Sequence, residues 1–596
     1  MQHNYSVLIY LNLLLLGACT SNSPEAAKPP SAAAQSQRLL QNGAVIGFEN
    51  ASHGHSWLGL PYAAPPVGAL RWEPPQPTTD WPARREALHA GSPCIQFGST
   101  LGGVGSADSH QGSEDCLYLN VYAPRLSESQ ANTTRLPVML WIHGGGNTTG
   151  EAAFYDGSVL ATRENVIVVM INYRLGPFGW FVLPNINLSN KVGPVNFGNL
   201  DSIAALRWVQ NNIDKFGGDP KNITVFGESA GGTNTLALLI TPSAKGLFNK
   251  VIIQSLGFGF SSLETATERS TATIQRLLRK QNKEDLHGAA VVDFLRNLDP
   301  WIIYEAYGDP NLEMGVQVPS AIQDNSLIKL GDPLVLLADP QQHIDVPVML
   351  GTNRDETKLF MAFDSLHTVQ IAGFPLWIRN IKSYERESHY RSLLWKADGV
   401  DSLAEKLSLN NAQTFTYRFD WDEQGVARGV LNVSRILGAA HGMEVPFVLG
   451  NFNVGPQSNL LYSKENEASR LKLSAEMMSY WTQFARTGNP ERGGKGDLVH
   501  WKPWSVSKIN GSLTVVPQLL IFDTTAGGGI RIINEQVSRR EIVQQMSAEP
   551  LNEVIKCALF KSTFRNRQDL AADAAWQNFL SGRCKGPRFN SMPASE

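Results

Sequence analysis

One serine stands between two glycines in a pattern that suits nucleophilic catalysis. Residues 227–231 read GESAG, the one G-x-S-x-G sequence in the chain. A serine held in such a sharp turn exposes its hydroxyl to substrate, and the glycines are needed because a Cβ at either position would clash. A chain this rich in Gly and Ser carries the pentapeptide by chance roughly one time in three, so its context has to decide.

The residues around Ser229 have the pattern of a strand, a turn and a helix. The β-branched run ITVF (223–226) leads into the turn, and the helix-compatible run GGTNTLALLI (231–240) follows it. We therefore expect Ser229 at the carboxyl edge of a sheet and at the start of a helix. The backbone N–H of Ala230 would then be one donor for a developing oxyanion.

A second glycine run follows another apolar strand. The sequence HGGG (143–146) comes directly after VMLWI (138–142), and glycines there let backbone N–H groups approach a ligand atom closely. An ordinary Gly-rich turn and a phosphate loop are the alternatives, and the second is poor because no G-x-x-x-x-G-K-[ST] is present. Upstream of a nucleophilic serine, the run fits the second half of an oxyanion hole.

Alternating strands and helices must position these residues. Short apolar runs predict buried strands, and helical patterns such as 201–216 lie between them, which indicates a largely parallel sheet covered on both faces. The connection 256–345 is long and helical, and we interpret it as an insertion over the sheet. The predicted strands are 138–142, 166–171, 223–226, 251–253, 346–350 and 414–419.

Composition excludes several classes of protein. The 596 residues are 42% hydrophobic and 18% charged, enough to build a large core. With 51 basic and 54 acidic residues the net charge is −3, which argues against nucleic acid as a partner because phosphate binding needs a basic surface. No apolar run reaches the roughly 18 residues of a spanning helix.

Taken together, these motifs resemble the type-B carboxylesterases, which include the cholinesterases. The resemblance runs from about residue 40 to 510 and implies the α/β-hydrolase fold: a mostly parallel central sheet flanked by helices, with long insertions forming the active-site gorge. The matching segments are LGLPYAAPPVGALRW (58–72), EDCLYLNV (114–121), NYRLGPFGWF (172–181), ALRWVQNNIDKFGGDP (205–220), the segment leading to GESAG (216–231) and YWTQFARTGNP (480–490).

The resemblance also implies the acid and base of a triad, which follow the serine in the order acid, then histidine. His441 stands in HGMEVPFVLG, matching the family's H-G-x-E-x-x-F-V-x-G context, and is the implied general base. The strand VPVML runs into GTNRDET, where the family carries its acid as the Glu of a D-E pair. That residue is Glu356, and Asp355 is the alternative, more typical of a structural turn residue.

A mechanism without a metal or cofactor follows from this set. His441 takes the proton of Ser229 as the hydroxyl attacks an ester carbonyl, and an acyl-enzyme forms and is hydrolysed. The N–H groups of Gly145, Gly146 and Ala230 would hold the oxyanion. Three roles stay open for the residue before the serine, Glu228: it tunes the electric field, binds an ordered water or is a passive family trait.

The expected substrate is a small-molecule ester, cleaved by a carboxylesterase of broad specificity. Choline-binding members of the family place a Trp ten residues before the second cysteine of the first disulfide loop, and that position is Ser106 here. A quaternary ammonium would lack its cation–π partner. The alternatives are an amidase or carbamate hydrolase on the same triad and a non-catalytic adhesion protein.

The N-terminal segment predicts export and a lipid anchor. Residues 1–18 contain an apolar block of signal-peptide length, although no Lys or Arg precedes it, and the block ends in LGAC, which resembles a bacterial lipobox with Cys19 as the lipidated residue. Residues 19–38 are rich in Ser, Ala and Pro and predict a flexible tether, and 39–596 form a single catalytic domain. The expected location is the bacterial outer membrane, reached only through the anchor.

Two other locations remain open. An ordinary secretory signal would make the protein periplasmic or secreted. Seven N-x-[ST] sequons after residue 40 would suit a eukaryotic secreted protein.

The other four cysteines predict two local disulfides in an exported chain. We expect Cys94 to pair with Cys116 and Cys557 with Cys584. None of the four has metal-ligand spacing, and H-E-x-x-H is absent from the sequence.

Overall fold

The computed structural model describes most of the chain. The described residues are 30–99, 109–184, 194–257, 259–308, 319–371, 374–409, 413–427, 431–455, 458–509, 512–564 and 579. The predicted signal segment, Cys19, Ser106 and Cys584 lie outside these ranges.

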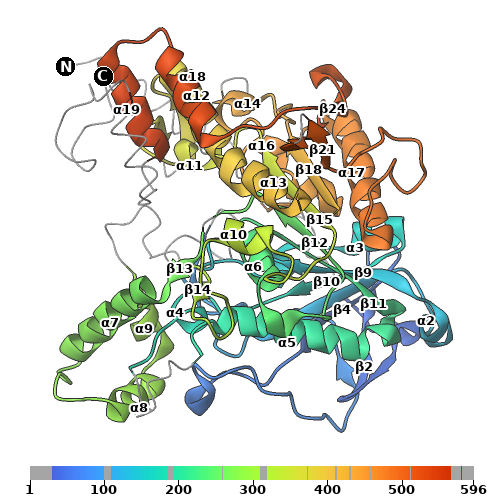
Figure 1. The fold of residues 1–596 in the computed structure, drawn as a ribbon. Helices are drawn as coiled ribbons and strands as arrows, with labels where there is room; N and C mark the ends of the chain where they lie inside the picture. Colours follow the sequence, from blue (N-terminus) through green and yellow to red (C-terminus); the bar gives the residue numbers. More distant parts are fainter. Residues whose placement is uncertain are drawn as a thin grey trace, which may run out of the picture.

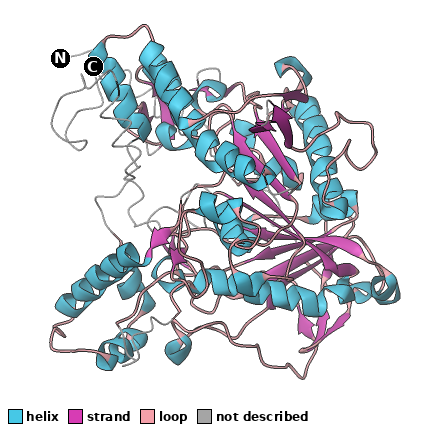
Figure 2. Ribbon diagram, viewed as in Figure 1, coloured by secondary structure: helices cyan, strands magenta, loops and turns pink. Residues whose placement is uncertain are grey.

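A sheet of eleven strands forms the centre of the molecule (Figures 1 and 2). Its order is β24-β23-β18-β15-β12-β11-β9-β10-β8-β4-β3, and the pairs from β10 to β23 are parallel while the strands at both ends are antiparallel. All six strands predicted from apolar runs belong to the parallel part. The bounds are β3 Phe48–Glu49, β4 His55–Pro61, β8 Tyr118–Ala123, β9 Leu136–Ile142, β10 Ile167–Ile171, β11 Gly218–Glu228, β12 Lys250–Gln254, β15 Val348–Asn353, β18 Thr414–Phe419, β23 Leu519–Phe522 and β24 Arg531–Ile533.

Alternating side chains of the sheet enter two separate cores. In β9, Val138, Leu140 and Ile142 belong to one buried cluster, and Met139 and Trp141 belong to the other. This follows from the two-residue period of a strand, and it explains why the predicted strands are apolar throughout: both faces are covered.

Helices cover both faces of the sheet. On one face α5 (Phe197–Asn212) and α6 (Ala230–Leu239) pack against β11, and α13 (Ser402–Ser408) packs against β18. On the other face α3 (Ser158–Glu164) and α17 (Glu467–Thr487) pack against the central strands. The predicted helix 201–216 is confirmed as α5 followed by a 3₁₀ turn, Ile213–Phe216.

Two further groups of helices lie at the periphery (Figure 1). The predicted insertion supplies α7 (Leu263–Lys280), α8 (Ala289–Asn297) and α9 (Pro300–Tyr307) to one group, whereas its α10 (Pro333–Ala338) lies beside α6 and packs against α13 and the main core. The helices α12 (Ile381–Lys396), α18 (Arg539–Ala548) and α19 (Glu553–Phe564) share a small core of their own. Shorter helices are α2 (Glu128–Thr133), α4 (Gly176–Gly179), α11 (Lys358–Ala362), α14 (Val433–Ile436), α15 (Val445–Leu449) and α16 (Ser458–Leu461).

Small two- and three-stranded sheets complete the fold. They are β1 (Arg38–Leu40) with β2 (Gly43–Ile46) and β5 (Arg85–Glu86), β6 (Gln96–Phe97) with β7 (His110–Gln111), β13 (Ser261–Ser262) with β14 (Ile322–Gln323), β16 (Thr368–Ile371) with β17 (Phe374–Ile378), β19 (Val426–Ala427) with β20 (Leu431–Asn432), and β21 (Ser505–Ile509) with β22 (Ser512–Val516).

Ordered structure includes the last residues of the predicted tether. Ser36 and Arg38 are buried, and the indole of Trp57 donates to the carbonyl of Ser36 at 2.7 Å. The folded part of the chain therefore includes a few residues before 39, the predicted start of the catalytic domain.

Candidate active site

Ser229 occupies a strained turn between β11 and α6. Its φ of 56° and ψ of −121° lie in a region that non-glycine residues seldom adopt. The turn leaves no room on either side: a Cβ at Gly227 would lie 2.6 Å from the backbone of Gly231, and one at Gly231 would collide with the carbonyl of Ile142. The predicted strand–turn–helix is confirmed, with the hydroxyl at the carboxyl edge of the sheet.

Glu356 and His441 form a buried pair. The Nδ1 atom of His441 lies 2.6 Å from Oε2 of Glu356, and the other carboxylate oxygen accepts hydrogen bonds from Thr352 Oγ1 at 2.8 Å and Asn353 N at 2.7 Å. The carboxylate is fully enclosed. A carboxylate so fixed selects the imidazole tautomer with its proton on Nδ1 and leaves Nε2 to act as a base.

Asp355 has a structural role, as its sequence context indicated. Its carboxylate accepts from the N–H of Ala439 at 3.1 Å and pairs with Arg354 and Lys358. These contacts join the loop after β15 to the loop that carries His441.

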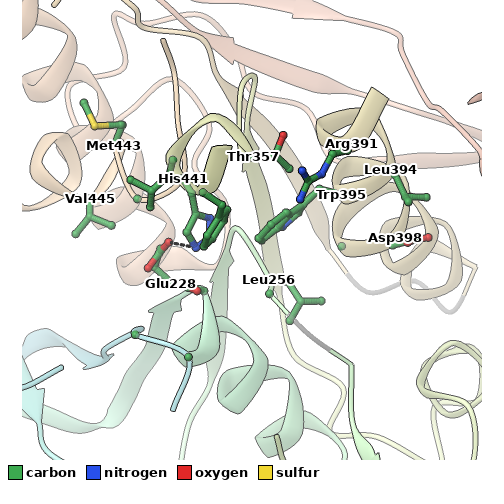
Figure 3. A pocket seen from close by; sticks show the side chains of 18 of the residues that line it. Glu228, Leu256, Thr357, Arg391, Leu394, Trp395, Asp398, His441, Met443 and Val445 are labelled. Atoms are coloured by element: carbon green, nitrogen blue, oxygen red, sulfur yellow. Dashed lines mark ion pairs between the residues drawn. The ribbon is translucent and has the colours of Figure 1, made fainter. Parts of the chain in front are cut away.

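The free nitrogen of His441 faces Glu228. Its Nε2 atom lies 3.0 Å from Oε1 of Glu228, as the dashed line in Figure 3 shows, but neither atom makes a hydrogen bond to the described residues. No hydrogen bond joins Ser229 to His441 in the described structure. Contacts of this kind are commonly long without substrate, and both residues line the same cavity.

Burial and charge act in opposite directions on this cluster. Burial lowers the pKa of His441, but the carboxylates of Glu228 and Glu356 outweigh it and raise the pKa to about 9. Burial raises the pKa of Glu228 to about 8, against the opposing effect of His441. Because the two groups lie so close together, their titrations are coupled.

A third buried carboxylate supports the site and was not singled out from the sequence. Glu444 accepts from Asn353 Nδ2 at 2.6 Å and from Gln254 Nε2 at 3.1 Å, and the indole of Trp481 donates to Gln254 at 3.0 Å. Asn353 also donates to the carbonyl of Ala440 at 2.7 Å. The available signal was the Glu three residues after His441 in the H-G-x-E motif.

The predicted oxyanion donors are free to bind a ligand. Gly145 and Gly146 have φ of 88° and 61°, a conformation that favours glycine, and both line the cavity with Ser229. Within the described ranges, the N–H groups of Gly145, Gly146 and Ala230 donate no hydrogen bond to protein atoms. Two backbone donors that line the cavity with Ser229 and a third from the residue after it are suited to binding a negative oxygen.

A cavity of about 1840 Å³ connects these residues to the surface. Figure 3 shows Trp395, Leu394 and Arg391 on one wall and Met443 and Val445 on another. The ring of Trp395 lies 4.9 Å from that of His441, centroid to centroid. No group of His, Cys, Asp and Glu suited to a metal ion occurs among the residues that the structure describes.

One of the two predicted disulfides is present. Cys94 is bonded to Cys116, and Ser99, in the loop between them, lines the cavity. Cys557, buried in α19, is disulfide-bonded as well, but Cys584 lies outside the described residues, so the pairing of these two cysteines stays a prediction.

The fold and site define a class: an α/β-hydrolase with a serine in the strained turn between β11 and α6. The model of the carboxylesterase family matches residues 34–388 and 388–515, and the chain belongs to that family.

Relatives and solved structures agree with this assignment. The chain is 36% identical over 471 residues to the para-nitrobenzyl esterase of Bacillus subtilis (strain 168), covering 75% of this chain and 88% of the relative. It is 32% identical to the fumonisin B1 esterase of Sphingopyxis macrogoltabida, covering 78% and 84%. A solved structure of PNB esterase superimposes with a TM-score of 0.65 at 29% identity, covering 86% of this chain and 99% of that one. The protein is a carboxylic ester hydrolase.

Proposed function

We propose that the chain is a carboxylesterase of broad specificity in which Ser229 is the nucleophile, His441 the general base and Glu356 the orienting acid. The observation that carries this proposal is the 2.6 Å contact between the buried Glu356 and His441, which lines the same cavity as Ser229. The strained backbone of Ser229 supports it, because such strain persists where the surrounding structure requires it and is concentrated at active sites.

In the proposed mechanism His441 turns from Glu228 to Ser229 when substrate is bound. The imidazole accepts the hydroxyl proton as Oγ attacks the ester carbonyl, and Gly145, Gly146 and Ala230 donate to the oxyanion. His441 then returns the proton to the leaving alcohol, and water cleaves the acyl-enzyme by the same steps.

Broad specificity is supported by the size and lining of the cavity. A volume of about 1840 Å³ exceeds that of most single-ligand pockets, and its walls carry apolar and aromatic side chains such as Phe360, Trp395 and Met443. The relatives' names cover chemically different substrates, among them para-nitrobenzyl esters, cocaine and a medium-chain fatty acyl-CoA. Ser106, which bears on choline esters, lies outside the described residues.

Replacing Ser229 with Ala tests the assignment. The variant should lose kcat toward a nitrophenyl ester by on the order of 10⁴-fold or more and should no longer be labelled by a fluorophosphonate, while its circular dichroism is unchanged. Retention of more than a small part of the activity would show that another group is the nucleophile. Matched nitroanilide and carbamate substrates then separate an esterase from an amidase or carbamate hydrolase.

We further propose that the protein is exported and lipid-anchored through Cys19. The support comes from the LGAC sequence at residues 16–19 and the Ser-, Ala- and Pro-rich residues after it.

A further inference from the structure

A β-hairpin beside the active-site cavity has an exposed apolar face. The strands β16 and β17 pair with Val369 opposite Trp377 and Ile371 opposite Phe374. Directly opposed residues of an antiparallel pair lie on the same side. A register shift separates the two pairs, but Val369 and Ile371 are two positions apart in β16 and therefore share a side, so these four side chains, the hairpin face, project together. Ile371 is 41% exposed, Phe374 48% and Trp377 56%.

This exposure is unusual for the molecule. Single exposed apolar residues are ordinary on protein surfaces, whereas a contiguous group marks an interaction site. Phe374 and Trp377 are the aromatic members of the exposed large hydrophobic residues in the described chain. Leu366 and Ile381, on either side of the hairpin, are exposed as well.

Positive charge borders the hairpin face. Arg379 and Lys382 follow β17, both are exposed, and neither is ion-paired within the described residues. The carboxylates nearby are already engaged: Glu385 pairs with Lys358 at 2.9 Å, and Glu387 contacts His367 and Arg391. Aromatic and aliphatic side chains bordered by unpaired Lys and Arg complement a lipid surface with anionic headgroups, because the rings enter the interface and the cations meet the headgroups.

The hairpin is continuous with the mouth of the cavity. It connects α11 to α12, labelled in Figure 1, and α11 and α12 both contribute to the cavity wall. The turn before β16 contributes Asp364, Ser365 and Leu366 to the cavity lining. The guanidinium of Arg379 donates to the carbonyl of Ser365 at 2.9 Å. This hydrogen bond holds the positive charge of Arg379 beside the turn that lines the cavity.

We propose that the hairpin face docks onto an anionic lipid surface and thereby brings the cavity mouth against it. Apolar esters held in that surface then reach Ser229 without crossing water. The delivery of substrate rests on the proposed function, but the docking does not.

The test uses the full chain carrying Cys19→Ala, so that no lipid anchor contributes. It is mixed with vesicles of phosphatidylcholine containing phosphatidylglycerol and with vesicles of phosphatidylcholine alone. The chain should co-sediment with the first, and Phe374→Ser with Trp377→Ser should weaken this binding by about tenfold or more. A matched control pair on other surfaces, Leu39→Ser with Leu471→Ser, should bind as the parent does.

Further variants test the role of the positive charges in vesicle binding and the independence of this binding from ester hydrolysis. Replacing Arg379 and Lys382 with Gln should weaken binding to the anionic vesicles. Raised salt should likewise weaken the binding of the Cys19→Ala chain that keeps both residues. Hydrolysis of a soluble nitrophenyl acetate should be unchanged in both sets of variants, which shows that they fold. Ser229→Ala should bind vesicles normally, so a failure of the catalytic assignment would leave the docking result intact.

Three results would overturn the proposal. The first is that the Cys19→Ala chain does not bind anionic vesicles. The second is that the chain with Phe374→Ser and Trp377→Ser binds them as strongly as the chain without these substitutions. The third is that the protein forms a dimer in solution and that these two substitutions abolish the dimer. The last would identify the hairpin face as a contact between two copies of the chain.

Discussion

His441 lies between two carboxylates that act on opposite ring nitrogens. Glu356 holds Nδ1 at 2.6 Å, and Glu228 approaches Nε2 to 3.0 Å. Both negative charges favour the imidazolium, yet the base in ester hydrolysis must be the neutral ring. Once Glu228 ionises, it therefore adds to Glu356 in favouring the imidazolium and delays the loss of the His441 proton as the pH rises.

This arrangement predicts the pH dependence of the reaction. The pKa of His441 is raised to about 9, so kcat/KM should increase with pH through an apparent pKa above 7 and decline as pH falls below it. Replacing Glu228 with Gln removes a charge that stabilises the imidazolium, and the rise should move to lower pH by about one unit. The measurement is a kcat/KM profile with a nitrophenyl ester.

The control for that experiment is the same substitution at Glu128, an exposed residue of α2 remote from the site. Its profile should overlay that of the parent. An unchanged profile for Glu228→Gln would mean that Glu228 does not interact with the base in the working enzyme.

The sequence identified the candidate catalytic residues but did not predict the contacts between their side chains. The residues of the proposed triad could be named because each stands in a short motif. The position of Glu228 against Nε2 could not be foreseen, because it depends on how three loops meet at the edge of the sheet. From sequence alone the base would have the ordinary histidine pKa of roughly 6–7.

The loop closed by Cys94 and Cys116 is an element that links stability to substrate binding. The two cysteines are 22 positions apart, and β6, β7 and Ser99 lie between them. Arg71 anchors the far end of the loop, with two hydrogen bonds of 2.6 Å to the carboxylate of Glu114. Cross-linking such a loop removes freedom from the unfolded chain, which contributes roughly 3 kcal/mol.

Replacing both Cys94 and Cys116 with Ser should therefore lower the free energy of unfolding by roughly 3 kcal/mol. Because Ser99 lines the cavity and the triad lies elsewhere, KM should change more than kcat. Denaturant unfolding and steady-state kinetics measure the two effects, and mild reduction of the parent should reproduce them. Peptide mapping without reduction that finds both thiols free would contradict the role of this bond.

Six of the strands in the parallel part of the sheet were predicted from the sequence, but β23, whose four residues are all buried, was missed. The parallel strands are apolar on both faces, so their runs stand out, and the elbow follows from its glycines. The hairpin of β16 and β17 was missed because its apolar residues are exposed and its strands are only four and five residues long. The antiparallel strands β4 and β8 were also missed, although each overlaps a segment that carried the family resemblance.

On the scale of the whole molecule, the chain enters the fold far from the cavity mouth. The strand β2, near the start of the described chain, lies at one end of the molecule in Figure 1, and α11 and α12 lie toward the other. Fifteen positions separate Cys19 from Ala34, the first residue of the ordered 3₁₀ turn, and a chain of that length spans at most about 50 Å. No helix in the described ranges is long and apolar enough to cross a membrane.

The proposed lipid anchor at Cys19 can be tested by cell fractionation. If Cys19 carries the acyl chains of a bacterial lipoprotein, each buried CH₂ contributes roughly 0.8 kcal/mol, and two or three chains hold the protein permanently. The parent should pellet with membranes and partition into detergent, whereas Cys19→Ala should lose most of both behaviours. Thr20 follows the cysteine where Asp would be the usual inner-membrane retention signal, so the parent should fractionate with the outer membrane. If the protein without substitutions is soluble and has an unmodified N-terminus, the segment is an ordinary secretory signal and not a lipid anchor.

The contributions of the lipid and of the hairpin face can be separated in the same experiment. Weak, salt-sensitive membrane association should persist in Cys19→Ala and disappear when Phe374→Ser and Trp377→Ser are added.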